Sequence, residues 1–331
     1  MASPLRFRHS TRSWTTDAVE SGIYQPLDST IGATITRPWF KAPDGFEARR
    51  FDMDNGDLAL FAWNDREGYW VGNTETPKTL WRTEKISLDG APSDISQWAQ
   101  RELLATLHER DPWLEQYPHI SWFFLPVFLS KDGRDSSRWF FSEHSAGFPE
   151  ADRESALTFY EEFLKSGVLD PYREVMAGKI GTSEEREPDR MTAAMGEFNA
   201  AYLLASNGYE IEPEASVTTG HSIDFRVSGD GGTTLVEVTR PAPVSRRNAD
   251  SPIEAIKSTV ETKTNGQLEA HAGGVVLLVD CSSFSESAFD TLQSNRIEVG
   301  HRPAVIYLLD TEGTTTGYSL GTIGLDLSGI D

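Results

Sequence analysis

The sequence predicts a two-domain protein, in which an α+β domain with an antiparallel sheet precedes an α/β module. Two observations lead to this division. All nine tryptophans lie between Trp14 and Trp139, in a stretch that also carries hairpin signals. From residue 191 onward the pattern changes to helical apolar spacing and short apolar strands. We place the first domain at residues 1–181 and the second at residues 189–331, joined by a polar linker.

Hairpin signals predict the antiparallel sheet of the first domain. Residues 49–53 and 57–63 resemble strands on either side of Asn55 and Gly56, a pair that supplies the positive φ angles of a tight hairpin turn. A second turn over residues 64–68 leads into another strand. Strands joined by such short turns pair antiparallel.

Two helices and a further hairpin are expected in the rest of this domain. Apolar spacing predicts helices over residues 94–109 and 152–165, the second ended by Gly167. The apolar runs 122–129 and 138–141 lie on either side of a Lys-Asp-Gly turn signal. We interpret them as the two strands of a third hairpin.

The second domain has a different succession, which predicts an α/β fold of the order α-β-β-β-α-β-α-β. Glycines and polar turns separate its segments, and Ser251 and Pro252 mark the start of its second helix. The expected helices are residues 191–207, 252–271 and 285–292, and the expected strands are residues 210–217, 222–227, 234–239, 274–279 and 304–309.

The charge of the chain is strongly negative, with 51 acidic against 30 basic residues and a net charge of −21. Only 8 of the basic residues are lysines. Such a surface is typical of halophilic proteins, which stay dispersed although salt screens their charges. High salt also removes most of the counterion-release contribution to nucleic-acid binding, so the acidity does not exclude a nucleic-acid partner.

Cysteine content and hydropathy limit the class of protein further. The single cysteine, Cys281, excludes an internal disulfide and a multi-cysteine zinc site. No apolar run approaches the roughly 18 residues that a membrane-spanning helix needs. The start of the chain is polar and basic, unlike a signal peptide. We therefore expect a cytoplasmic protein that does not associate with membranes.

Three acidic residues of the second domain form a candidate site. Glu197 lies in the middle of the first expected helix, and Asp224 and Glu237 each lie inside a short apolar strand. An acid in such a strand is costly to bury unless it is paired or binds a metal. A hairpin between the two strands would bring both acids to one sheet end, an arrangement that suits Mg²⁺, with Mn²⁺ as the alternative.

The ordered set of Glu197, Asp224 and Glu237 resembles the PD-(D/E)XK nuclease superfamily, which has the restriction-endonuclease-like fold. The resemblance covers about residues 189–309. It implies Mg²⁺ bound by Asp224 and Glu237, with Glu197 as a further ligand or a supporting acid, and a nucleic-acid substrate, DNA rather than RNA. The whole chain also resembles a haloarchaeal protein family, a resemblance that implies no function for the first half.

One position departs from the superfamily pattern. Thr239 stands where the superfamily usually has a lysine that positions the attacking water and offsets charge on the phosphate. In some branches a lysine of the next helix does this, often with a glutamine one turn on, and Lys263 and Gln267 resemble that variant. Helical periodicity alone allows Lys257 at the sheet as readily as Lys263. Arg240, close after Glu237, and Lys257 are further candidates for phosphate contact.

Each acid also has a plainer interpretation. Glu197 could be a solvated helix residue, and Asp224 and Glu237 could lie on the wet face of an antiparallel hairpin. Two functions therefore stay open. The first is a Mg²⁺-dependent nuclease, and the alternative is a nuclease-fold protein that has lost catalysis and acts as a nucleic-acid-binding or assembly module. In either case the first domain would recognise the substrate, a partner protein or a second copy of the chain.

Overall fold

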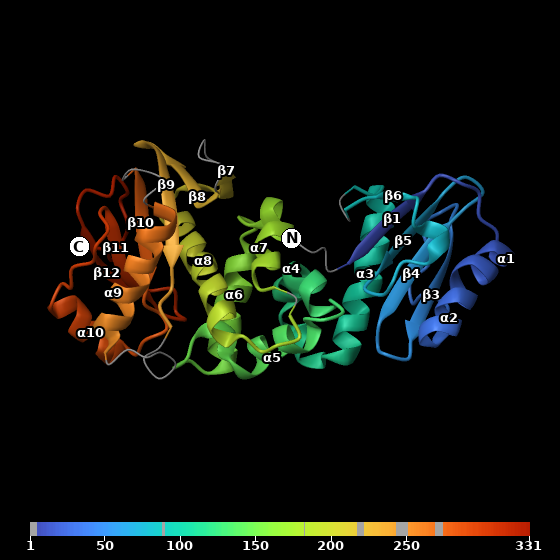
Figure 1. The fold of residues 1–331 in the computed structure, drawn as a ribbon, viewed down its shortest axis with the longest axis horizontal. Helices are drawn as coiled ribbons and strands as arrows, with labels where there is room; N and C mark the ends of the chain where they lie inside the picture. Colours follow the sequence, from blue (N-terminus) through green and yellow to red (C-terminus); the bar gives the residue numbers. More distant parts are fainter. Residues whose placement is uncertain (1–4, 88–89, 182, 217–221, 243–250, 269–273) are drawn as a thin grey trace. The chain divides into compact units, whose positions relative to one another are not determined.

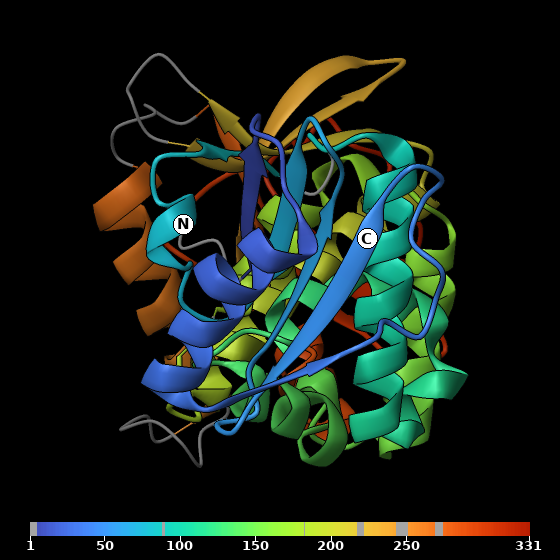
Figure 2. The ribbon, with the colours of Figure 1, turned by 90° about the vertical axis from the view of Figure 1, so that its right-hand side faces the viewer.

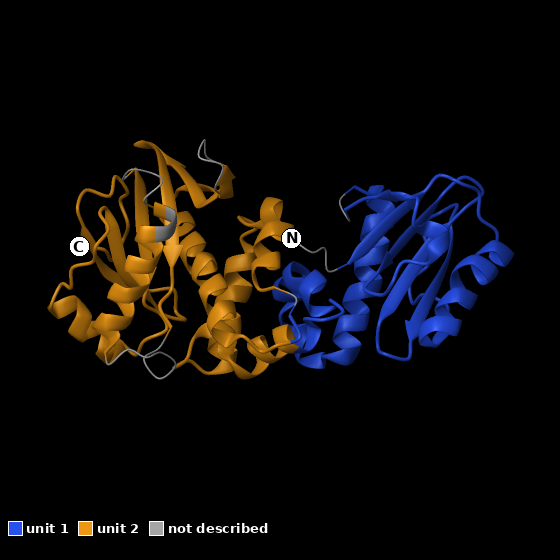
Figure 3. Ribbon diagram, viewed as in Figure 1, with its two compact units in different colours: residues 1–135, 182–184 blue, residues 136–181, 185–331 orange. Residues whose placement is uncertain are grey.

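The chain forms two compact units, which Figure 3 shows in different colours. The first comprises residues 1–135 and 182–184, and the second comprises residues 136–181 and 185–331. Residues 136–181, which the sequence assigned to the first domain, thus pack with the second unit. The division into functional domains at 181–189 stays a prediction. This computed structural model describes the chain from residue 5 onward, apart from residues 88–89, 182, 217–221, 243–250 and 269–273.

A six-stranded antiparallel sheet, in the order β2-β3-β4-β5-β1-β6, forms the first unit (Figure 1). The hairpins expected over residues 49–63 and 64–71 are confirmed. In the first turn Gly56 has φ +80°, whereas Asn55 is not among the residues with positive φ. The strands are β1 Arg6–Ser10, β2 Ala33–Thr36, β3 Glu47–Met53, β4 Leu58–Trp63, β5 Gly68–Gly72 and β6 Glu84–Lys85.

Helices lie on both faces of this sheet (Figure 2). On one face Phe61 and Trp70 are fully buried together with Ile23 and Leu27 of the short helices that follow β1. On the other face Arg50 of β3 donates to Thr106 of α3 (2.8 Å). The helices are α1 Thr16–Val19, η1 Glu20–Tyr24, α2 Gln25–Ile31, η2 Lys78–Leu80, α3 Ser93–Arg110, η3 Pro112–Gln116 and α4 Pro118–Phe128.

The third hairpin prediction is wrong. Residues 122–129 lie in and just after α4, and residues 138–141 lie in α5 (Arg134–Glu143). In α4 nearly every side chain from Phe123 to Phe128 is buried, so the run is apolar on all sides and has no helical period to detect. The Lys-Asp-Gly turn is present but connects two helices. The helices expected over 94–109 and 152–165 are confirmed as α3 and α6.

The second unit contains a mixed six-stranded sheet in the order β12-β11-β10-β9-β8-β7. β9, β10 and β11 are parallel, whereas β7, β8 and β12 pair antiparallel with their neighbours. The strand β12 was not expected from the sequence. The strands are β7 Glu210–Ser216, β8 Ser222–Gly229, β9 Gly232–Thr239, β10 Val275–Asp280, β11 Ala304–Leu309 and β12 Thr315–Leu320.

Helices cover this sheet on both sides (Figure 1). Ile256 and Val260 of α9 pack with Leu277 and Ile306 in the core on one face, and α8 packs against β9 and β10. Within the described ranges no helix is both long and apolar enough to cross a bilayer. The helices that begin within this unit are η4 Ser145–Gly147, α6 Arg153–Lys165, η5 Asp170–Tyr172, α7 Arg173–Lys179, α8 Pro188–Ser206, α9 Pro252–Lys263, η7 Thr264–Leu268 and α10 Glu286–Ser294.

Candidate metal centre

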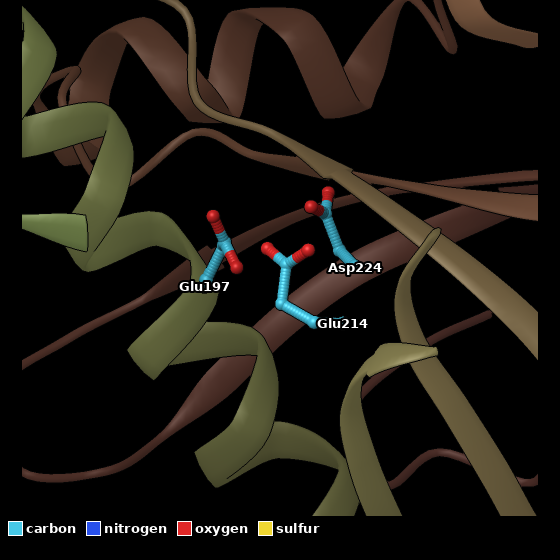
Figure 4. A group of neighbouring side chains, drawn as sticks. All are labelled: Glu197, Glu214 and Asp224. Atoms are coloured by element: carbon cyan, nitrogen blue, oxygen red, sulfur yellow. The ribbon is translucent and has the colours of Figure 1, made fainter. Parts of the chain in front are cut away.

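Three carboxylates from three different elements converge at one end of the second sheet. Glu197 comes from α8, Glu214 from β7 and Asp224 from β8, and one oxygen of each lies within 4.8 Å of the other two. Figure 4 shows their side chains directed toward a common point. All three are half-buried. Like charges held this close repel one another, so the cluster favours a cation at its centre.

The position of Glu197 depends on the glycine that precedes it. A Cβ atom at Gly196 would lie 2.9 Å from the Cβ of Arg240, which is closer than ordinary van der Waals contact. The missing side chain therefore lets α8 lie close against the residue that follows β9. This close packing fixes Glu197 at the end of the sheet where β7 and β8 carry their acids.

Glu214 adopts a backbone conformation that is unusual for a residue with a side chain. Its φ is +54°, in the left-handed region, which costs about 1–2 kcal/mol for such a residue. The ladder of β7 and β8 pairs Pro213 with Phe225 and Ala215 with Ile223 on either side of it. Strain of this kind is concentrated at functional sites. Sequence reasoning had not identified Glu214, because no motif marks it.

Asp224 and Glu237 bind the backbone of each other's strand. The amide of Asp224 donates to Glu237 Oε2 (3.2 Å), and the amide of Val238 donates to Asp224 Oδ2 (2.9 Å). The last backbone pair of the ladder at this end is Phe225 with Val236, so the two carboxylates take over where the ladder stops. This exchange holds both acids at neighbouring positions at one end of the sheet, as expected for two strands joined in a hairpin.

Lys263, the last residue of α9, reaches this pair of acids. Its Nζ lies 2.7 Å from Glu237 Oε1 and 3.8 Å from Asp224 Oδ2. The lysine of the next helix thus lies beside the acids, although Thr239 stands at the usual lysine position of β9.

A second lysine, which the sequence did not point to, contacts the other half of the cluster. Lys179 ends α7, and its Nζ lies 2.6 Å from Glu197 Oε2 and also contacts Glu214 Oε1. Among the described residues Glu197 Oε2 accepts no well-aligned hydrogen bond, so its contact with Lys179 is an ion pair. The segment before residue 189 therefore contributes to this site.

The protonation of the cluster reflects burial and crowding. Burial, and then the charge of Asp224, raises the pKa of Glu197 to about 8, although Lys179 opposes the shift. Burial and Asp224 also raise the pKa of Glu237, with Lys263 acting in the opposite direction. Burial alone would lower the pKa of Lys263, but Asp224 and Glu237 raise it above its usual value, so this lysine stays charged.

The remaining predicted residues lie in different surroundings. The Arg240 side chain is fully buried, where it donates to Ser283 and Gly147 and lies 3.4 Å from Asp280. Lys257 is exposed on α9. Gln267 lies in η7, but its side chain is outside the part of the chain that the structure describes.

Comparison with protein families identifies the relatives of the chain. A model with the description "Family of unknown function (DUF5784)" matches residues 2–327. The chain belongs to DUF5784. A search of curated proteins finds no match to this DUF5784 chain.

A search of solved structures finds a distant similarity to SfsA of Pyrococcus furiosus in complex with Ca²⁺. The match has 16% sequence identity, covers 39% of the DUF5784 chain and 62% of SfsA, and has a TM-score of 0.18. The match thus spans less than two thirds of SfsA. A TM-score this low carries no argument about the fold or the function of the DUF5784 chain.

Proposed function

We propose that this chain is a metal-dependent nuclease of the PD-(D/E)XK type, which hydrolyses phosphodiester bonds in nucleic acid, DNA in preference to RNA. One observation carries the proposal. Lys263 Nζ lies 2.7 Å from Glu237 and 3.8 Å from Asp224, so a lysine accompanies the acid pair despite Thr239. The resemblance to the superfamily requires a pair of acids on neighbouring strands, a lysine beside them and an acid on the preceding helix. Asp224 with Glu237, Lys263 and Glu197 correspond to these groups.

The donor set fits Mg²⁺ or Mn²⁺. Both are oxygen-seeking ions, and Mg²⁺ binds oxygen at about 2.0–2.1 Å, so two ligands of one ion lie roughly 3–4 Å apart. The convergence of Glu197, Glu214 and Asp224 within 4.8 Å is close to that spacing. These three acids and Glu237 carry four negative charges when all are ionised, against two positive charges on Lys179 and Lys263. The excess of two negative charges (4 − 2) matches one divalent cation. Asp224 and Glu197 would hold it together with Glu214 of the same cluster and with Glu237 beside Asp224, and it would activate water and stabilise charge on the phosphate.

The side chains of the protein would share the remaining work. Lys263 would attract a phosphate oxygen or orient the attacking water, because its charge is held beside the acids. Glu237 would fix the position of that lysine, and Gln267 would orient the same group. Lys257 would contact the substrate backbone. Arg240 is bonded in the interior, so we assign it to packing rather than to phosphate contact.

A second candidate is a nucleic-acid-binding or assembly protein that has kept the fold and lost the chemistry. Thr239 favours it, since an uncharged residue stands at the strand position where the superfamily usually has a lysine. Lys179 favours it as well, because its ammonium group already contacts Glu197 and Glu214, two of the proposed metal ligands. A protein of this kind would bind nucleic acid without cleaving it.

A cleavage assay in concentrated KCl separates the two candidates. Labelled single-stranded and duplex DNA and RNA are incubated with Mg²⁺, Mn²⁺ or a chelator. We expect metal-dependent cleavage that Asp224→Asn and Glu237→Gln each reduce by about 100-fold or more. Asp230→Asn, an exposed acid in the β8–β9 turn, is the matched control and should retain the wild-type rate. Wild-type protein that binds but does not cleave would support the second candidate instead.

A further inference from the structure

The first unit carries a basic hollow at the edge of its sheet. A cavity of about 580 Å³ is lined by Arg6 and Arg8 of β1, Lys85 of β6, and Trp81, with Glu75 as the one acid. Three basic residues against one acid give a local charge of +2 (3 − 1), in a chain whose net charge is −21. The volume lies within the range of about 300–1,000 Å³ that is typical of ligand sites.

Two basic residues of this hollow lie directly opposite each other in the sheet. Arg8 pairs directly with Lys85 across the β1–β6 ladder. Like charges directly opposite each other destabilise a sheet. At the neighbouring pair of the same ladder, His9 and Glu84 have complementary character and lie 3.6 Å apart. Within the described ranges Arg6, Arg8 and Lys85 form no ion pair, so this repulsion is retained on the surface.

Trp81 gives the hollow an aromatic wall. It is 60% exposed, whereas Trp14, Trp63 and Trp70 of the same unit are core residues. Its indole nitrogen donates to the carbonyl of Thr76 (2.7 Å), which fixes the ring while leaving it accessible. The same ring also lines a second hollow of about 560 Å³ beside α2, so it stands between two cavities.

From this arrangement we infer that the first unit binds a single strand of nucleic acid, with its phosphates on Arg6, Arg8 and Lys85 and a base stacked on Trp81. Proteins that hold single strands combine a basic groove with aromatic platforms in this way. An unstacked base is required for contact with Trp81, which favours a single strand over a duplex. Stacking also persists at high salt, where phosphate contacts alone are weak. The inference does not depend on the second unit being a nuclease.

The test is the binding of a fluorescent oligothymidylate about 15 nucleotides long, measured by anisotropy with a chelator present so that no metal-dependent cleavage occurs. We expect Trp81→Ala to weaken binding by about tenfold, the effect of losing one stacked base. Trp81→Phe, which keeps an aromatic face but lacks the indole nitrogen, should stay within about threefold of wild type. Trp39→Ala is the control, since Trp39 is 48% exposed but does not line the hollow.

Charge reversal tests the phosphate contacts separately. We expect Arg6→Glu with Lys85→Glu to weaken binding by tenfold or more and to reduce the slope of log K against log [KCl] by about 0.7 for each phosphate that is no longer neutralised. Lys41→Glu, an exposed lysine of the same unit outside the hollow, should leave the slope unchanged. Circular dichroism confirms that the variants are folded.

Three results would overturn the inference: wild type that fails to bind the oligonucleotide, folded Trp81→Ala and charge-reversed proteins that bind like wild type, or a duplex that binds more tightly through the same residues. Asp224→Asn keeps this hollow intact. Loss of cleavage in that variant with unchanged binding would therefore leave the inference standing, and so would a wild type that binds and does not cleave.

Discussion

Lys263 Nζ lies 2.7 Å from Glu237 Oε1, and this contact joins the end of α9 to β9, an inner strand of the mixed sheet. The sequence of β9 alone would have suggested a site without its lysine, because Thr239 stands two residues after Glu237. The helix that follows β9 supplies the charge instead. The proposed nuclease activity depends on this one contact more than on any other.

Removal of that lysine should abolish most of the activity. We expect Lys263→Ala to lower kcat by about 100-fold, and Lys263→Arg to recover part of it. Adding Thr239→Lys to Lys263→Ala should also restore part of the rate, since residue 239 lies on the same face of β9 as Glu237. Lys165→Ala, an exposed lysine of α6, is the control. A Lys263→Ala protein with the wild-type kcat would show that the contact has no catalytic role.

The raised pKa of Glu197 predicts how stability depends on pH without metal. Its pKa is 4.5 ordinarily and about 8 in the folded chain, where it faces Lys179, Glu214 and Asp224. The folded state therefore holds a proton that the unfolded state releases, and this contribution to stability is full below pH 4.5 and falls as pH rises toward 8.

Denaturant unfolding in a chelator at constant KCl measures this effect. The free energy of unfolding should fall between pH 5 and 8 in the wild type, and Glu197→Gln should reduce that fall because it stays neutral throughout. Glu212→Gln, an exposed acid of β7, should retain the full fall. Equal pH profiles for wild type and Glu197→Gln would mean that Glu197 is ionised across this range.

Sequence reasoning found the residues that belong to a recurrent pattern and missed those that do not. Asp224 and Glu237 were identifiable because each lies inside a short apolar strand. Lys263 was chosen over Lys257 only through the resemblance to the superfamily, because helical periodicity allows both. Glu214 was missed, because its approach depends on a left-handed φ that no residue type announces. Lys179 was missed because it comes from a short helix outside the recognised module. Such contacts arise from tertiary packing, which local patterns do not encode.

The fold was likewise predictable where local sequence determines the structure, and unpredictable where tertiary packing determines it. The Asn-Gly signal located the β3–β4 hairpin because Gly56 supplies the positive φ that its turn requires. The run over residues 122–129 resembles a strand because a short segment buried on all sides has no detectable period. The length of the segment distinguishes a helix from a strand, since α4 runs for 11 residues from Pro118, which is longer than a typical strand.

Lys179 should act as a substitute for the metal. Its Nζ lies 2.6 Å from Glu197 Oε2, and both side chains are largely buried. We expect Lys179→Ala to lower the free energy of unfolding without metal by up to about 3 kcal/mol above pH 8, where Glu197 and Glu214 are both ionised and lose their counter-charge. Mn²⁺ should then stabilise the variant more than it stabilises the wild type. Thermal unfolding with and without Mn²⁺ measures both effects, and an equal Mn²⁺ shift in the two proteins would contradict this role.

Arg240 should matter for folding rather than for the substrate. Its side chain and that of Asp280 are both fully buried and lie 3.4 Å apart. Truncation to Arg240→Ala should cost about 3–5 kcal/mol of stability, because it leaves Asp280 buried without its counter-charge. Lys257→Ala, on the exposed face of α9, should change stability by less than about 0.5 kcal/mol. A fully stable Arg240→Ala protein with a raised KM would instead indicate contact with phosphate.

The most direct test of the metal centre is a titration of the metal-free protein with Mn²⁺, followed through the electron paramagnetic resonance signal of the free ion. We predict saturable loss of that signal, and an affinity at least about tenfold lower in Asp224→Asn and Glu237→Gln but unchanged in Asp230→Asn. Wild-type protein that leaves the free Mn²⁺ signal intact, or an Asp224→Asn protein that binds as tightly as wild type, would contradict the proposed metal centre.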